Sequence, residues 1–210
     1  MKYLLITLIF VVLYVGSVLS EEVMLNANSI IKKSDAGVAV VNDKDASIGK
    51  AMEFTAGANN PLSPNPTTYV DMEFTASAGK YNIWLRAKSD GDTSTDSLWI
   101  QFDDEIGTDK GDRYPARGLG NWIDVHPAGE YVWASNEVIP PDGPTVVSYT
   151  FEKGGKHTLR IQPRQVPHRI DQIWLSTTQD KYPKDNRPVG GFAVEYKGKL
   201  AATWAGVKRT

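Results

Sequence analysis

One stretch, residues 155–176, constrains the fold of this chain more than any other. In its first half Leu159 and Ile161 alternate with polar residues, which is the pattern of a β-strand with one buried face. Pro163 and Pro167 interrupt the alternation, because proline has no N–H to donate to a sheet, and the pattern then resumes. The stretch therefore predicts two strands joined by a loop, in an antiparallel sheet whose apolar face is covered by a second sheet.

The same two-residue period recurs along most of the chain, whereas helical spacing is nearly absent. Further strands are predicted at residues 23–27, 38–41, 51–55, 69–75, 81–87, 98–102 and 146–151. Residues 81–87 and 98–102 are expected to form a hairpin across a turn that begins at Ser89. The sequence thus predicts an all-β protein, built as a two-sheet antiparallel β-sandwich.

The first twenty residues predict a signal peptide. Lys2 precedes an uncharged, apolar run from Leu4 to Val15, which as a helix spans only about 18 Å and is too short to cross a bilayer core of ~30 Å. Small residues at Val18 and Ser20 favour cleavage after Ser20. We therefore expect a secreted protein, extracellular or periplasmic, with no membrane span after cleavage; an uncleaved anchor is the alternative.

The remaining length, about 190 residues, suits one domain. We assign residues 21–178 to the sandwich and residues 179–210 to a linker and a short β tail, which either packs on the sandwich or makes a separate contact at a surface. Without residues 1–20 the chain has 22 basic and 25 acidic residues, a formal charge of −3. No basic surplus indicates a nucleic-acid partner. The absence of cysteine means that the fold must be stable without disulfides.

Several stretches resemble one family of proteins. The stretch GKHTLRIQPRQVPHRIDQIWLS at 155–176 resembles the closing strands of carbohydrate-binding modules of the family 6, family 35 and malectin-like group. DKDASIGKA at 43–51 resembles an early stretch of that group, and YNIWLRA at 81–87 with DSLWI at 96–100 resembles its central strands. The motifs occur in the family's order over roughly residues 23–176. The resemblance implies a jelly-roll sandwich of the galactose-binding-like kind, which binds a polysaccharide or glycan at its loop-lined end.

Aromatic residues outside the alternating strands are the candidate sugar contacts, because flat rings stack on the C–H faces of sugars while polar neighbours bind hydroxyl groups. The candidate carbohydrate-binding residues are Tyr114, Asn121, Trp122, His126, Tyr131 and Trp133. Each tryptophan among them has an alternative role in plugging the end of the core. Trp84, Trp99 and Trp174 lie within strand patterns and are predicted to be packing residues.

The resemblance also implies a structural calcium ion. In the resembled modules it lies between a Glu-Ala-Glu stretch in the first strand and an aspartate in the last; here these positions are Asn26-Ala27-Asn28 and Asp171. Neutral amides replace two charged ligands, and calcium affinity follows ligand charge, so the site is expected to be weak or lost. Asn28 and Asp171 are the candidate metal ligands.

No catalytic motif is present, so we expect a binding domain and not an enzyme. The first suspects for a glycan-degrading enzyme are Asp124, Glu130 and Glu137, which are more simply explained as solvated loop charges. Arg86, Arg160, Arg164 and Arg169 could together bind an acidic sugar, or could form ion pairs with Asp96, Asp103 or Asp171. A different class of function is a structural or adhesion domain at the cell surface that binds a protein partner.

Overall fold

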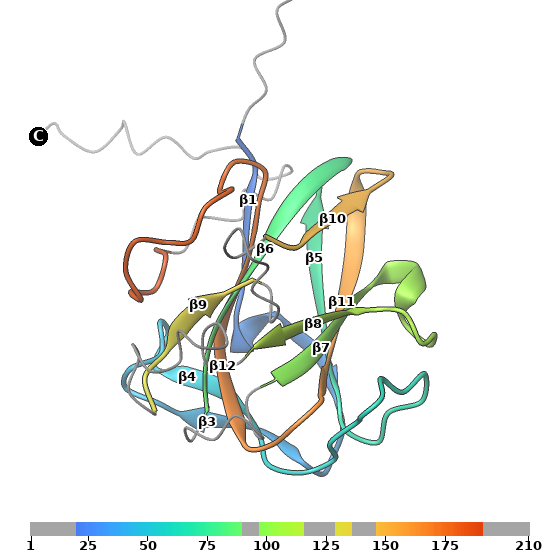
Figure 1. The fold of residues 1–210 in the computed structure, drawn as a ribbon, viewed down its shortest axis with the longest axis vertical. Coiled ribbons are helices and arrows are strands. Elements are labelled where there is room, and N and C mark those ends of the chain that lie inside the picture. The colour runs from blue at the N-terminus through green and yellow to red at the C-terminus, as the bar shows by residue number, and fades with distance from the viewer. Residues whose placement is uncertain (1–19, 90–96, 116–128, 136–145, 191–210) are drawn as a thin grey trace, which may run out of the picture.

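The computed structural model describes residues 20–89, 97–115, 129–135 and 146–190, which form two antiparallel sheets packed face to face (Figure 1). The two-sheet antiparallel sandwich predicted from the sequence is therefore confirmed. The predicted signal peptide lies almost wholly outside the described residues. Within the ranges described, no helix is long and apolar enough to cross a bilayer.

The larger sheet has seven strands and the smaller has five. In the seven-stranded sheet the order is β10 (Ser148–Phe151), β6 (Gly79–Ser89), β12 (His168–Ser176), β4 (Lys50–Phe54) and β3 (Val38–Asn42), with β1 (Glu22–Leu25) also pairing with β12 and β9 (Val132–Ala134) with β6. The five-stranded sheet has the order β2 (Ile30–Lys33), β5 (Val70–Ala76), β11 (Gly155–Pro163), β7 (Ser97–Phe102) and β8 (Asp112–Pro115). Two short 3-10 helices, η1 (Ala27–Ser29) and η2 (Asp103–Glu105), follow β1 and β7.

The alternation along the strands decides which side chains enter the core. Each sheet turns one set of alternating apolar residues toward the other sheet, and these residues form one buried cluster. The seven-stranded sheet contributes Met52, Phe54, Ile83, Leu85, Ile173 and Leu175, among others, and the five-stranded sheet contributes Val70, Met72, Leu98, Ile100, Leu159 and Ile161. The intervening residues therefore lie on the two outer faces of the sandwich.

Two predicted pairings are wrong. β11 and β12 are not neighbours, because β11 lies in the five-stranded sheet and β12 in the seven-stranded one, so the proline-containing loop between them crosses from one sheet to the other. β6 and β7 are likewise in different sheets and form no hairpin. Period-two alternation indicates that a segment has one buried face, and it carries no information on which strand lies beside it.

The structure also has three strands outside the segments that the sequence predicted to be strands. β2 lies between the predicted strands 23–27 and 38–41, and β8 and β9 lie between the predicted strands 98–102 and 146–151. Each is only three or four residues long and pairs with one longer strand, β5, β7 or β6 respectively. Segments this short become strands because they pair with a longer neighbouring strand. Their own periodicity covers too few residues to be detected in the sequence.

Candidate functional site

The described members of the predicted sugar site are all buried. Tyr114 is fully buried in the main core, and Tyr131 and Trp133 are each only 4% exposed. The expectation that these three rings stand open in loops is therefore wrong, because Tyr114 and Trp133 lie on β8 and β9 and all three are enclosed. Asn121, Trp122 and His126 lie outside the described residues. A role of these six residues in sugar binding stays a prediction.

Trp133 belongs instead to an aromatic cluster on the outer face of the seven-stranded sheet. The cluster consists of Met24, Trp84, Trp133 and Trp174, contributed by β1, β6, β9 and β12. Its tryptophans lie at positions that alternate with core residues, so they point away from the sandwich interior. The rings of Trp133 and Trp174 meet edge to face, with centroids 5.7 Å apart and planes at 64°. We call this group the outer tryptophan cluster.

The outer tryptophan cluster is covered by residues 179–190, here called the C-terminal strap. The strap contains no strand and follows Thr177 and Thr178, which are hydrogen-bonded to Glu21 and Glu22 beside the start of β1. Side chains of the sheet donate hydrogen bonds to main-chain carbonyls of the strap. These bonds run from Trp84 Nε1 to Gln179 O (2.9 Å), Arg86 Nε to Asn186 O (2.8 Å), Trp133 Nε1 to Arg187 O (3.0 Å) and Gln172 Nε2 to Val189 O (3.0 Å).

Two side chains of the C-terminal strap reach down to the sheet. The ring of Tyr182 lies edge-on to Trp84, with centroids 4.8 Å apart, and its hydroxyl accepts a bond of 3.3 Å from the N–H of Ser135. Val189 packs against the tryptophan cluster, and its N–H donates to Gln172 Oε1 at 3.1 Å. Residues 179–190, assigned from the sequence to a linker, are therefore docked on the sandwich.

Between the C-terminal strap and the sheet is a pocket of about 680 Å³. Trp133 and Trp174 form its sheet side. The other lining residues all belong to the strap and are mostly polar: Gln179, Asp180, Lys181, Tyr182, Pro183, Lys184, Asp185, Arg187, Pro188 and Val189. The pocket thus combines the edges of two indole rings with amide, carboxylate and ammonium groups, which is the mixture of groups that binds sugars.

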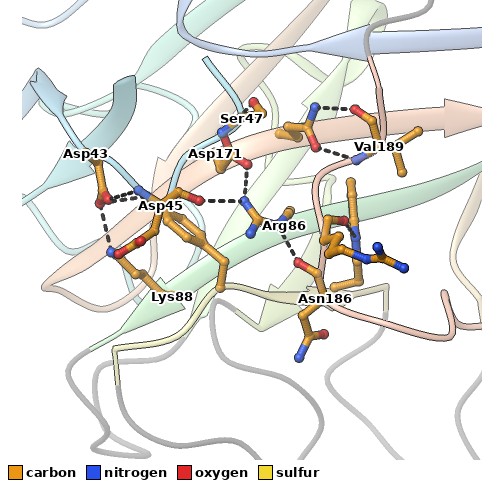
Figure 2. A network of polar contacts seen from close by, with 12 residues as sticks. Asp43, Asp45, Ser47, Arg86, Lys88, Asp171, Asn186 and Val189 are labelled. Atoms are coloured by element: carbon orange, nitrogen blue, oxygen red, sulfur yellow. Dashed lines mark hydrogen bonds and ion pairs between the residues drawn. The ribbon is translucent and has the colours of Figure 1, made fainter. Parts of the chain in front are cut away.

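Beside the outer tryptophan cluster the same face carries a network of charged side chains, centred on two buried aspartates (Figure 2). Asp171, from β12, is fully buried and pairs with the guanidinium group of Arg86, from β6. The other oxygen of Asp171 accepts bonds of 2.7 Å from both the N–H and the hydroxyl of Ser47. This pair fixes the loop between β3 and β4 onto the sheet, and the Asn186 carbonyl of the strap caps the same guanidinium group.

Asp43 is the second centre of this network. Its carboxylate binds Lys88 Nζ at 2.8 Å, Arg169 Nη1 at 3.2 Å and the hydroxyl of Tyr131 at 3.0 Å. Burial by itself would raise the pKa of Asp43, but hydrogen bonds from Lys88, the Asp45 N–H and Tyr131 outweigh it and lower the pKa to about 2. Tyr131 therefore lies within a structural charge network, with Lys88 Nζ 4.4 Å from its ring centroid.

Two of the four arginines considered for an acidic sugar are on this face, and each is paired. Arg86 pairs with Asp171, as the alternative interpretation expected, and Arg169 pairs with Glu53 at 2.6 Å as well as with Asp43. Arg160 is on the opposite sheet, where it makes a two-point contact with Asp71 at 2.7 and 2.8 Å. These guanidinium groups are thus occupied by carboxylates of the protein itself.

The residues named for calcium do not fit that ion. Asn28 is exposed on η1, and both carboxylate oxygens of Asp171 already accept hydrogen bonds from Ser47 and Arg86. Calcium requires six to eight oxygen ligands, and no group of three His, Cys, Asp or Glu side chains capable of holding a metal occurs among the residues that the structure describes. Calcium binding stays an untested prediction.

The sequence did contain a signal for the outer tryptophan cluster. Trp84 and Trp174 occupy positions at which the alternation of their strands predicts a polar residue. Trp84 lies between the core residues Ile83 and Leu85, and Trp174 lies between Ile173 and Leu175. Large apolar residues on the outward face require a cover or a ligand. The strap that provides this cover has no periodicity of its own, so its docking could not be inferred from the sequence.

Comparison with known proteins gives similarities in structure only. No family model matches the chain, and no curated protein sequence matches it. Among solved structures, a family 35 carbohydrate-binding module from Clostridium thermocellum is 15% identical, with a TM-score of 0.46, over 73% of this chain and 98% of that one.

Two further solved structures are similar at the same level. The C-terminal family 6 module of the laminarinase LamC from Zobellia galactanivorans is 12% identical, with a TM-score of 0.41, over 75% of this chain and all of that one. A Podospora anserina β-(1,4)-mannanase with a family 35 module is 12% identical, with a TM-score of 0.47; the match covers 78% of this chain and 28% of that one.

Proposed function

We propose that this chain is a non-catalytic carbohydrate-binding domain and that it binds sugar at the outer tryptophan cluster. The observation that carries the proposal is the pocket of about 680 Å³, in which Trp133 and Trp174 face the polar side chains of residues 179–188. Indole rings supply apolar stacking surface and the polar groups supply hydroxyl contacts. The ordered motif resemblance to carbohydrate-binding modules supports the same class of ligand. Secretion, predicted from residues 1–20, would bring the domain to an extracellular polysaccharide.

Affinity electrophoresis of the mature protein tests this proposal, in gels that contain laminarin, β-1,4-mannan or hydroxyethyl cellulose. We expect at least one polysaccharide to retard the protein, and Trp133→Ala and Trp174→Ala each to weaken that binding at least tenfold. Trp99→Ala is the matched control, because Trp99 is half-buried on the other sheet, where its Nε1 donates to Asn59 O at 2.8 Å. Loss of binding with Trp99→Ala alone would place the sugar on the five-stranded sheet and contradict the proposed site.

A second candidate function is a structural or adhesion domain that binds no sugar. The burial of Trp133 and Trp174, which are 4% and 8% exposed, favours it, because little of either ring is open to a ligand while the strap is docked. This function would be supported if no polysaccharide retards the mature protein in the gel and a pull-down with it as bait recovers a protein partner. Release of reducing sugar from the same polysaccharides would contradict both proposals and indicate an enzyme.

A further inference from the structure

The outer tryptophan cluster forms a continuous row across the sheet. Met24 on β1 lies directly opposite Trp174 on β12, and Trp174 lies directly opposite Trp84 on β6. Trp133 on β9 lies opposite Arg86, which is two residues after Trp84 on β6, and so extends the row along the strand direction. Directly opposed residues on neighbouring strands have adjacent side chains on one face. The row is therefore an apolar platform on the outer face of the sheet, and of its members only Trp133 and Trp174 line the pocket.

The C-terminal strap contacts this platform in the way an extended ligand would. Four side chains of the sheet, listed above with their distances, donate hydrogen bonds to four carbonyl oxygens of the strap main chain. These contacts depend on acceptor oxygens and not on the identity of the strap residues. Hydroxyl and ring oxygens of a saccharide chain accept the same bonds, so the donors and the rings beneath them suit a polysaccharide equally well.

The C-terminal strap is held on this face without strand pairing and without a fully buried residue. Each of its residues is exposed or half-buried, and its ion pair between Arg187 and Asp185 is internal to it. Thr177 and Thr178 are held by hydrogen bonds to Glu21 and Glu22, so the chain is anchored just before the strap begins. Segments with few buried contacts open at low free-energy cost while the core stays folded.

From these observations we propose that the strap is a displaceable occupant of the tryptophan platform, and that an extended polysaccharide binds the platform by lifting the strap away. This inference rests on the proposed function and extends it: sugar first enters the pocket beside Trp133 and Trp174, and sugar and strap then compete for the platform. As the strap lifts, the hydrogen-bond donors of the sheet replace the polar groups of the strap as the contacts of the sugar. Because a ligand must then overcome the strap contacts, a loosened strap raises the apparent affinity for sugar.

The full mature chain with Tyr182→Ala and Val189→Ala tests the proposal, since both changes remove strap side chains that pack on the cluster. We expect this variant to bind the retarding polysaccharide at least fivefold more tightly, and its tryptophan emission to shift to the red with greater acrylamide quenching. Tyr69→Ala is the control, because Tyr69 lies beside Arg160 and Lys32 on the other sheet. Equal or weaker sugar binding by a folded double variant overturns the proposal.

A synthetic peptide of residues 179–190, added to the double variant, separates the claim that the chain binds sugar from the claim that sugar displaces the strap. We expect it to restore the blue emission and to lower polysaccharide binding. If the peptide restores the emission but none of the polysaccharides binds any protein, the proposed function is wrong, and with it the competition with sugar. If the double variant does not fold, Tyr182→Phe, which loses the bond from the Ser135 N–H, must show the same effects on a smaller scale.

Discussion

At the scale of single residues, burial decides the chemistry of the ionisable groups. His168 on β12 stacks on Phe54, with ring centroids 5.1 Å apart, and is only 2% exposed. Burial lowers the pKa of His168 to about 4, and neither of its buried ring nitrogens has a hydrogen-bond partner among the described residues. Between these two pKa values, 6.5 in the unfolded chain and about 4 in the folded protein, the side chain is thus neutral when folded and charged when unfolded.

This depressed pKa predicts how stability depends on pH. Between pH 6.5 and pH 4 the unfolded state binds a proton at residue 168 and the folded state does not, so the free energy of unfolding falls as the pH falls. The loss from this residue is about 3 kcal/mol over that interval. His168→Phe should remove this part of the loss. Urea midpoints of both proteins at pH 7, 5.5 and 4.5 would measure it, and parallel losses in the two proteins would contradict it.

At the scale of elements, short edge strands and one loop are fixed by neighbours that are distant in sequence. β8 and β9 exist because β7 and β6 present unpaired edges to them, and this pairing moves Tyr114 and Trp133 out of the predicted loops. The loop between β4 and β5 is likewise held by a close approach. Gly57 has φ +80, and a Cβ there would be 1.9 Å from Thr68 Oγ1.

Gly57→Ala should therefore destabilise the protein more than the same change at another glycine of similar backbone geometry. The strained φ and the overlap with Thr68 together cost about 2–4 kcal/mol of unfolding free energy. Gly49→Ala is the control, because Gly49 has φ +70 with no atom within 4 Å of the added Cβ, and should cost about 1–2 kcal/mol. Urea unfolding of both variants measures the difference, and equal losses would show that the contact with Thr68 is unimportant.

At the scale of the whole molecule, the two outer faces of the sandwich differ. The face of the seven-stranded sheet carries the tryptophan row, the charge network and the strap that covers them. The face of the five-stranded sheet carries the half-buried rings of Tyr69 and Trp99 beside polar residues such as Arg160 and Gln162. The charged loop between β3 and β4 is held in place by the ion pair between Asp43 and Lys88 and by hydrogen bonds from Ser47 to Asp171.

This arrangement predicts that calcium does not stabilise the protein. Asp171, the ligand that the resemblance implies, is already neutralised by Arg86, so a calcium ion would have to displace a buried guanidinium group. We expect the melting temperatures measured in excess CaCl₂ and in excess EGTA to agree within about 1 °C. A rise of several degrees with calcium, reversed by EGTA, would contradict this and restore the metal prediction.

The sequence by itself determined the fold class and most strand positions. Alternation records which side of a strand is buried, and burial of one face per sheet leaves a sandwich as the solution. It also placed Trp84 and Trp174 in strands, which is confirmed, and named Asp171 among three possible partners of four arginines, of which Arg86 is the one that pairs with it.

Only the tertiary structure decided which strands are neighbours, and where an aromatic surface lies. The assignment of β6 and β7 to different sheets, and the burial of Tyr114 and Trp133, depend on contacts between residues far apart in the chain. The docking of residues 179–190 depends on main-chain carbonyls, which every residue possesses. A contact made by the backbone leaves no trace in the order of side chains, and for this reason the strap side of the candidate site could be found only in three dimensions.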